Sequence, residues 1–218
     1  MAIPIESTPP PGWGLQGIES LLDAFPRGRL SEIVGSWSSG STSLLQALLV
    51  RATAAGDLAA LVDADGVFDP ASAARAGLDL RRLLWVRCGG QITVALRAAD
   101  LLARCPGFAV VAVDLLPPPA RSMGHRGLDH PALVRLERGV SGRDTTLVFR
   151  SPRHVAGSVA ALVVEVRQQH PCWIGLPRPT RLGGLASEVS VRHTRGPVAR
   201  QLLPGQSWTI TWSPPWNA

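Results

Sequence analysis

Residues 30–49 read LSEIVGSWSSGSTSLLQALL, and this stretch decides the fold class. It begins as a short apolar run, passes through a loop with Gly35 and Gly40, and ends in a leucine-rich run with helical spacing. A strand, a glycine-bearing loop and a helix in this order are typical of a loop whose N–H groups wrap a phosphate at a helix N-terminus. By spacing alone, the same residues also fit a tight turn between strand and helix. Both interpretations predict an α/β protein.

The residues that follow Gly40 indicate a loop that has lost its catalytic cation. We refer to residues 35–42 as the glycine loop. A phosphate loop carries a lysine before its Ser or Thr, whereas here Ser41 precedes Thr42, and all 22 basic residues of the chain are arginines. A serine hydroxyl is uncharged and too short for the terminal phosphates, so charge-assisted hydrogen bonds of about 1.5–3 kcal/mol each are lost. The residues expected to form a nucleotide-binding-like cradle are Gly35, Ser39, Gly40, Ser41 and Thr42.

The rest of the chain repeats the alternation of strands and helices. Short, almost wholly apolar runs separated by helices predict a mostly parallel, twisted sheet with helices on both faces. Alternating residues near the C-terminus predict antiparallel strands at one edge. The expected organisation is a proline-rich flexible arm over 1–16, a single domain over 17–212 and a tail over 213–218. The predicted strands cover 30–34, 58–65, 83–86, 108–114, 145–150 and 161–169, and the predicted helices cover 17–25, 42–56, 70–77, 91–104 and 131–139.

Composition restricts the partners and the compartment. The net charge of +6 and the pI near 11.0 favour a polyanion or an acidic protein surface, although the arginine-only bias also fits a GC-rich genome. The three cysteines form no C-x-x-C pair, so neither a disulfide framework nor a zinc site is indicated. No apolar run has the length of a membrane span or the form of an export signal. We therefore expect a cytoplasmic, nucleoid-associated protein with no membrane partner.

Several motifs, taken in order, resemble the ATPase core of the RecA family. GIESLLDAFPRGRLSEIVGSWSSGSTSLLQALL is similar to the turn, first strand and phosphate loop of that family. LVDADGVFDPASAARAGLDLRRLLWV resembles its second strand, the loop with the catalytic acid and an Asp-Pro helix, and FAVVAVDLL resembles its Walker B strand. The similarity continues through TTLVFR and EVSVRHTRGPVARQ. It covers about residues 17–212 and implies a RecA-like phosphate-loop fold.

The resemblance also assigns roles, and it shows where this chain departs from them. Asp114 matches the Walker B aspartate that holds the Mg²⁺ shell, and Asp65 falls where the family carries the glutamate that activates water. An Asp is one methylene shorter, and a misplacement of about 1 Å can cost on the order of a hundredfold in rate. Arg150 and Ser151 stand near the family's γ-phosphate-sensing glutamine, which is missing. Asp65 and Asp114 are thus vestigial candidates, binding of ATP and Mg²⁺ is doubtful, and the protein is expected to be a weak ATPase or none.

Other departures concern DNA and self-assembly. The family's N-terminal docking helix is matched only by the proline-rich arm, and its second DNA-binding loop is reduced to about ten residues, SPRHVAGSVA. Basic residues in the two loops suggest a rim for single-stranded DNA, with a solvated loop surface as the alternative. The candidates are Arg121, Arg126, Arg150 and Arg153. Trp37 inside the glycine loop either packs where a nucleotide would lie, stacks an adenine or anchors a partner.

Within the RecA superfamily, a chain without the docking helix and without the lysine of the phosphate loop most resembles ImuA, the accessory protein of bacterial mutagenesis cassettes. This resemblance implies a non-catalytic role in the DNA-damage response and error-prone translesion synthesis, with an ImuB-like pseudo-polymerase, RecA and single-stranded DNA as expected partners. Such a subunit is expected to limit RecA activity. The alternatives are an active DNA-dependent ATPase with a variant loop and a single-stranded DNA-binding module.

Overall fold

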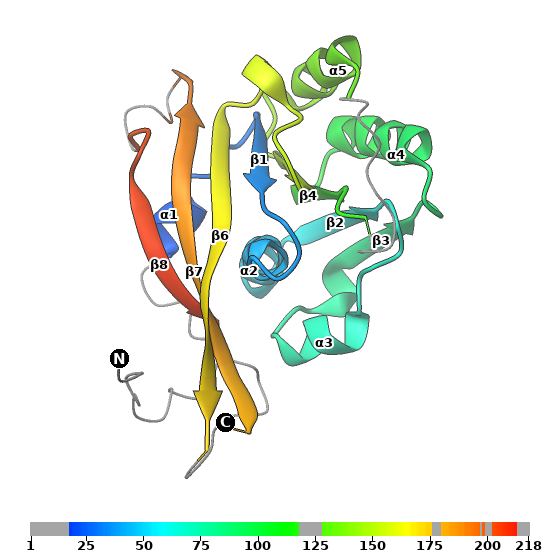
Figure 1. Ribbon diagram of the computed structural model, residues 1–218. Helices are drawn as coiled ribbons and strands as arrows, with labels where there is room; N and C mark the ends of the chain where they lie inside the picture. Colours follow the sequence, from blue (N-terminus) through cyan, green and yellow to red (C-terminus); the bar gives the residue numbers. More distant parts are fainter. Residues whose placement is uncertain (1–17, 118–127, 176–179, 197, 199–201, 213–218) are drawn as a thin grey trace.

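The computed structural model describes residues 18–117, 128–175, 180–196, 198 and 202–212 (Figure 1). The expected arm over 1–16, the tail over 213–218, Arg121 and Arg126 lie outside these residues. The helices are α1 (Glu19–Asp23), α2 (Ser41–Ala54), α3 (Pro70–Arg75), α4 (Ile92–Arg104) and α5 (His130–Val140), with 3₁₀ turns η1 (Leu80–Arg82) and η2 (Gly157–Val159). The strands are β1 (Leu30–Val34), β2 (Leu58–Asp63), β3 (Leu83–Arg87), β4 (Phe108–Asp114), β5 (Thr146–Ser151), β6 (Leu162–Ile174), β7 (Arg181–Thr194) and β8 (Ser207–Trp212).

The eight strands form one mixed sheet in the order β3-β2-β4-β5-β1-β6-β7-β8. The pairs from β3 through to β6 are all parallel, and β6–β7 and β7–β8 are antiparallel. This arrangement confirms the predicted α/β fold with antiparallel strands at the C-terminal edge. Because the parallel strands all point the same way, their carboxyl ends meet along one edge of the sheet, where ligands of open α/β sheets bind.

The parallel strands are apolar on both faces because both faces are covered. Along β4, Val110 and Ala112 belong to one buried cluster, and Val111 and Val113 belong to the other. The first cluster includes residues of α1, α2 and α3, and the second includes residues of α4 and α5. A strand that is buried on both faces has no polar side chains alternating with apolar ones. A continuous apolar run therefore predicts it correctly. Helices on both faces are therefore confirmed (Figure 1).

Local sequence determines where the short helices begin. Asp69 caps α3, since its carboxylate accepts hydrogen bonds from the amides of Ala71 (3.1 Å) and Ser72 (3.2 Å), and Pro70 stands at the first helical position. Helix α2 follows Gly40, whose φ of 94° lies in the left-handed region. Among the described residues, no helix has the length and apolar character needed to cross a membrane.

Strand β6 continues beyond its predicted end at residue 169. It pairs with β7 as far as Ile174, so the two strands form a long hairpin that extends past the body of the sheet (Figure 1). Irregular register steps at Gln168/His170 and Cys172/Trp173 surround Pro171, which cannot donate a ladder hydrogen bond. The strand-like sequence pattern of β6 ends where the hairpin leaves the core. Beyond that point β6 stays extended because it pairs with β7, which its local sequence does not reveal.

Candidate functional site

The glycine loop curls back on itself at the carboxyl end of β1. Ser39 and Ser41 are both buried, and the Ser39 hydroxyl accepts a hydrogen bond from the Ser41 amide at 3.2 Å. The Ser41 hydroxyl donates to the Gly35 carbonyl at 3.4 Å. Ser38 has a positive φ of 61°. The side chain at the lysine position is therefore turned into the loop and bonded there.

Gly35 is required by this close approach. A Cβ atom at Gly35 would lie 2.5 Å from the Ser39 Oγ and 2.7 Å from the Ser41 Cβ. Both neighbours belong to the buried side of the loop, so the loop itself would have to move. The first glycine of the motif thus has a steric role in this chain, independent of any ligand.

We expect Gly35→Ala to lower the free energy of unfolding by about 1–3 kcal/mol, the usual effect of overpacking a tight site. Urea denaturation measures the change. Gly139→Ala is the matched control, because a Cβ there meets its nearest neighbour at 3.6 Å inside α5, where alanine favours the helix. Equal stability of Gly35→Ala and the control would contradict the folded-back loop.

The start of α2 keeps the open amides of an anion cradle. Within the described chain, no backbone acceptor pairs with the amides of Gly40, Thr42 or Ser43, whereas the Leu44 amide already bonds to the Gly40 carbonyl at 3.1 Å. Free N–H groups at a helix N-terminus favour negative charge. The five predicted cradle residues therefore lie together in one loop: Gly35, Ser39, Gly40, Ser41 and Thr42. Whether a nucleotide binds there depends on the side chains that face the loop.

Arg150 is the group that faces the glycine loop. It ends strand β5 beside Asp114 of β4, and the two residues are direct partners in the strand register. The guanidinium binds the Asp114 carboxylate in a bidentate manner, with Nε to Oδ1 at 3.0 Å and Nη2 to Oδ2 at 2.5 Å. Its Nη1 donates to the Thr42 hydroxyl at 2.5 Å. Only 1% of Arg150 is exposed, so the expectation that it belongs to an exposed DNA-binding rim is wrong for this residue.

The buried position also affects Asp114. Burial raises the pKa of the Asp114 carboxyl, and the Arg150 charge and its hydrogen bonds offset part of that rise. One carboxylate oxygen additionally accepts from the Leu116 amide at 3.0 Å. Asp114 is thus fully engaged by protein groups.

Asp63, which sequence reasoning did not single out, organises the loop that carries Asp65. Its buried carboxylate accepts hydrogen bonds from the amides of Gly66 (2.9 Å), Val67 (3.1 Å) and Phe68 (3.1 Å) and from the Trp85 indole at 3.2 Å. Asp65 is half-buried two residues further on. The only sequence signal for Asp63 is a charged residue at the end of an apolar strand.

Trp37 closes one side of a small cavity beside the loop. Its indole N–H donates to the Pro117 carbonyl at 2.6 Å, and 42% of the residue remains exposed. The cavity measures about 220 Å³ and is also lined by Thr42, Asp114 and Arg150. That volume is below the roughly 300–1,000 Å³ typical of small-molecule pockets. The hydrogen bond and the small cavity favour the packing interpretation of Trp37.

Magnesium does not fit this site as it stands. A phosphate loop holds Mg²⁺ through its Ser or Thr hydroxyl and the Walker B Asp, and here Arg150 binds both. Among the described residues, no group of three or more His, Cys, Asp or Glu side chains is arranged to hold a metal ion. The arrangement as it stands supports recognition through hydrogen bonds.

The other DNA-binding candidate among the described residues, Arg153, lies in the segment that follows β5. It lines a cavity of about 640 Å³ together with His154, Arg192 and His193. Arg192 and His193 come from β7, about forty residues further along the chain. Arg192 forms an ion pair with Glu165 at 2.5 Å. The structure thus places Arg153 around one hollow with three further basic or titratable side chains.

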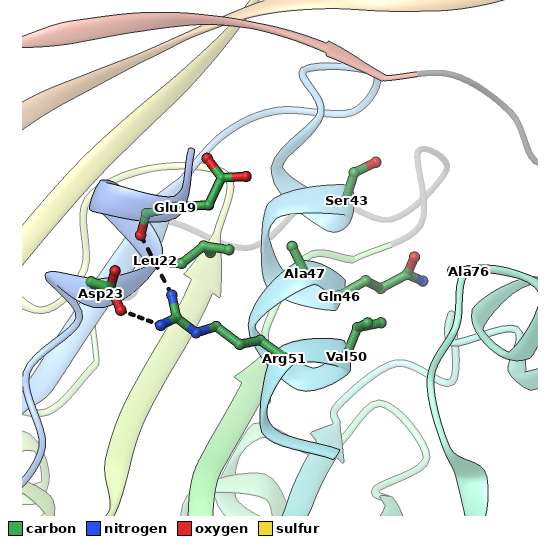
Figure 2. A pocket seen from close by; sticks show the side chains of 9 residues that line it. All are labelled: Glu19, Leu22, Asp23, Ser43, Gln46, Ala47, Val50, Arg51 and Ala76. Atoms are coloured by element: carbon green, nitrogen blue, oxygen red, sulfur yellow. Dashed lines mark hydrogen bonds and ion pairs between the residues drawn. The ribbon is translucent and has the colours of Figure 1, made fainter. Parts of the chain in front are cut away.

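A third cavity, of about 480 Å³, lies along α2, with α1 on one side and Ala76, at the end of α3, on the other (Figure 2). Its lining is mostly apolar, with Leu22, Ala47 and Val50 from α1 and α2. Arg51 crosses its rim, where it binds the Asp23 carboxylate and donates to the Glu19 carbonyl. Arg51 and Asp23 are thus paired at the rim, and the Glu19 side chain is exposed.

Comparisons with known proteins agree with the motifs. The sequence matches the RecA N-terminal domain family over residues 13–130. It is 32% identical over 178 residues to Protein RecA of Corynebacterium diphtheriae, covering 78% of this chain and 46% of that protein. It is also 32% identical over 164 residues to Protein RecA of Thermus aquaticus, covering 73% of this chain and 46% of that protein. The chain spans about half the length of the curated relatives that it matches.

The structure has a similar relative among solved proteins. The crystal structure of the RadB recombinase superposes with a TM-score of 0.64 at 18% sequence identity, covering 90% of this chain and 93% of that one. At this identity the similarity concerns the fold. It supports the order of strands and helices described above.

Proposed function

Because the chain belongs to the RecA family, we propose that it is a non-catalytic RecA-like accessory protein of the DNA-damage response that supports error-prone translesion synthesis. It acts by binding partners. The proposed partners are a RecA filament and an ImuB-type pseudo-polymerase, with single-stranded DNA as a further ligand. This assignment to the ImuA type rests on the state of the glycine loop.

The observation that carries the proposal is the Arg150 guanidinium on Asp114 and Thr42. An ATPase of this fold uses these two side chains for Mg²⁺ and a lysine for the phosphates. In this chain the first pair is bound to an arginine, and Ser41 at the lysine position is bonded to its own loop. Three catalytic functions are replaced by internal contacts, which supports a binding role.

The sheet offers an edge for a partner at β3. This strand pairs with β2 on one side only among the described residues, so its outer N–H and C=O groups can accept another strand. Leu84 on β3 is 45% exposed, and Leu101 on α4 is 72% exposed. A RecA-shaped subunit that binds a filament through this edge and does not use ATP would stop its growth.

We expect the purified protein to shorten RecA filaments on single-stranded DNA and to slow strand exchange, as measured by electron microscopy and a fluorescence assay. Leu84→Asp should weaken this effect by about 10- to 100-fold, because burying a leucine contributes about 1.5–3 kcal/mol. The matched control is Leu203→Asp, which changes a leucine that is 67% exposed away from β3.

Three outcomes would count against the proposal. Unchanged filament length and strand exchange would remove the RecA partner, and equal loss in both leucine variants would remove β3 as the surface. ATP hydrolysis that Asp114→Asn abolishes would instead establish an active ATPase.

A second candidate function is single-stranded DNA binding at the Arg153 cavity. The hollow brings Arg153 and His154, which follow β5, beside Arg192 and His193 of β7, and such a group of basic side chains suits a phosphate backbone. Glu165 in the same lining opposes that charge. Affinity for single strands that falls steeply with salt in the absence of RecA would favour this function over the proposed one.

A further inference from the structure

Arg150 stands where a phosphate-loop protein places its metal ion. The metal of such a loop is defined by two protein atoms, the hydroxyl of the loop Ser or Thr and the carboxylate at the end of the Walker B strand. In this chain those atoms belong to Thr42 and Asp114, which come from different elements, α2 and β4. A single guanidinium binds both, at 2.5 Å from the hydroxyl and at 2.5 Å and 3.0 Å from the two carboxylate oxygens.

The contacts are those of a built site. Arg150 is 1% exposed and Asp114 is buried, so water does not compete for their charges as it does at a surface ion pair. An arginine stays protonated under all ordinary conditions, and its planar fork matches a carboxylate in a bidentate manner. The position therefore carries a permanent positive charge.

The neighbouring strand supplies no alternative ligand. Asp63 lies opposite Asp114 in the β2–β4 register, but its oxygens accept hydrogen bonds from three amides and the Trp85 indole. A divalent ion at Thr42 would thus meet a fixed cation and no free carboxylate among these groups. Like charges in a buried site repel strongly.

We propose that Arg150 is a built-in cation that takes the place of Mg²⁺, so that the glycine loop is a divalent-metal-independent site. The proposal concerns the metal position alone and does not depend on which partner the protein binds. It predicts that removing the guanidinium uncovers a metal site made by Thr42 and Asp114.

The test uses Mn²⁺ as the probe, with bound metal counted by electron paramagnetic resonance. The wild type should bind no Mn²⁺ in an Asp114-dependent manner, and Arg150→Gln should gain one ion per chain that Arg150→Gln/Asp114→Asn loses. The melting temperature of Arg150→Gln should rise by about 5–10 °C at a Mg²⁺ concentration a hundred times its Kd, and that of the wild type should not move.

Arg81→Gln is the matched control, because Arg81 also binds a carboxylate in a bidentate manner, that of Asp79, at the surface. It should gain no metal site. Asp114-dependent Mn²⁺ binding by the wild type would overturn the proposal, as would an Arg150→Gln variant that gains none. If that variant is unfolded without metal, its folding in millimolar Mg²⁺, followed by circular dichroism, supports the proposal and its failure to fold there overturns it.

Discussion

Replacing Glu32 by alanine is expected to lower the free energy of unfolding by about 3–5 kcal/mol, because each buried donor that loses its acceptor costs about 1–3 kcal/mol. Glu32 lies in the middle of β1 and is fully buried. Its carboxylate accepts hydrogen bonds from the Ser151 hydroxyl (2.9 Å) and from the amides of Val155 (2.7 Å) and Ala156 (3.2 Å). It also contacts the His154 ring nitrogen at 2.5 Å.

These contacts join the first strand to the segment that follows β5. The segment contains Arg153 and His154, which line the basic cavity, so loss of Glu32 should also release that cavity wall. Urea denaturation measures the stability, and trypsin cleavage after Arg153 measures the order of the segment. Glu32→Gln should show an intermediate loss, because an amide keeps one acceptor oxygen.

The control for this prediction is Glu19→Ala, an exposed carboxylate in the first turn of α1, which should change stability by no more than about 0.5 kcal/mol. A Glu32→Ala protein as stable as the control, with the same cleavage rate, would show that the contacts around Glu32 do not hold the segment.

The strands and helices could be predicted from sequence because burial on both faces leaves a local trace. FAVVAVD (108–114) contains no polar residue before its last position, and the structure buries its alternate residues against opposite helix layers. The outer half of β6 leaves no such trace. Residues 168–174 read QQHPCWI, which has no strand-like pattern, and pairing with β7 keeps them extended.

The site was harder to predict, because its decisive contacts join distant residues. Arg150 meets Asp114 through the β4–β5 register and Thr42 through the packing of α2, across 36 and 108 positions of sequence. Motif comparison identified Thr42 and Asp114 and placed Arg150 near the family's γ-phosphate-sensing glutamine, but Arg150 was also counted among the candidates for a DNA-binding rim. One signal was present: an arginine that ends an apolar strand needs a carboxylate if it is buried.

Glu32 and Asp63 follow the same rule. Each is a carboxylate within or at the end of an apolar strand, and each binds the backbone of the loop that comes after a neighbouring or the same strand. Charged residues within predicted buried strands therefore indicate which positions of such a sequence belong to the site. Their partners become visible only with the fold.

The second large effect is expected at the buried pair itself. Asp114→Leu should lower the free energy of unfolding by about 3–5 kcal/mol, because it leaves the Arg150 guanidinium buried without a counter-charge. Arg150→Met should lose a similar amount for the opposite reason. The double variant Asp114→Leu/Arg150→Met should instead lie close to the wild type or above it, since replacing a buried ion pair with apolar groups of similar volume is often neutral or stabilising by about 1–4 kcal/mol.

The raised pKa of Asp114 points in the same direction, because it means that burial disfavours the charged carboxylate more than Arg150 restores it. A double-mutant cycle in urea separates the two contributions, and the matched cycle at the exposed Arg27–Asp144 pair should show little coupling. If the double variant were clearly less stable than the wild type, the ion pair would be a net source of stability relative to apolar side chains. Its retention would then need no functional explanation, whereas a stable double variant that loses its action on RecA would show that the charges are kept for binding.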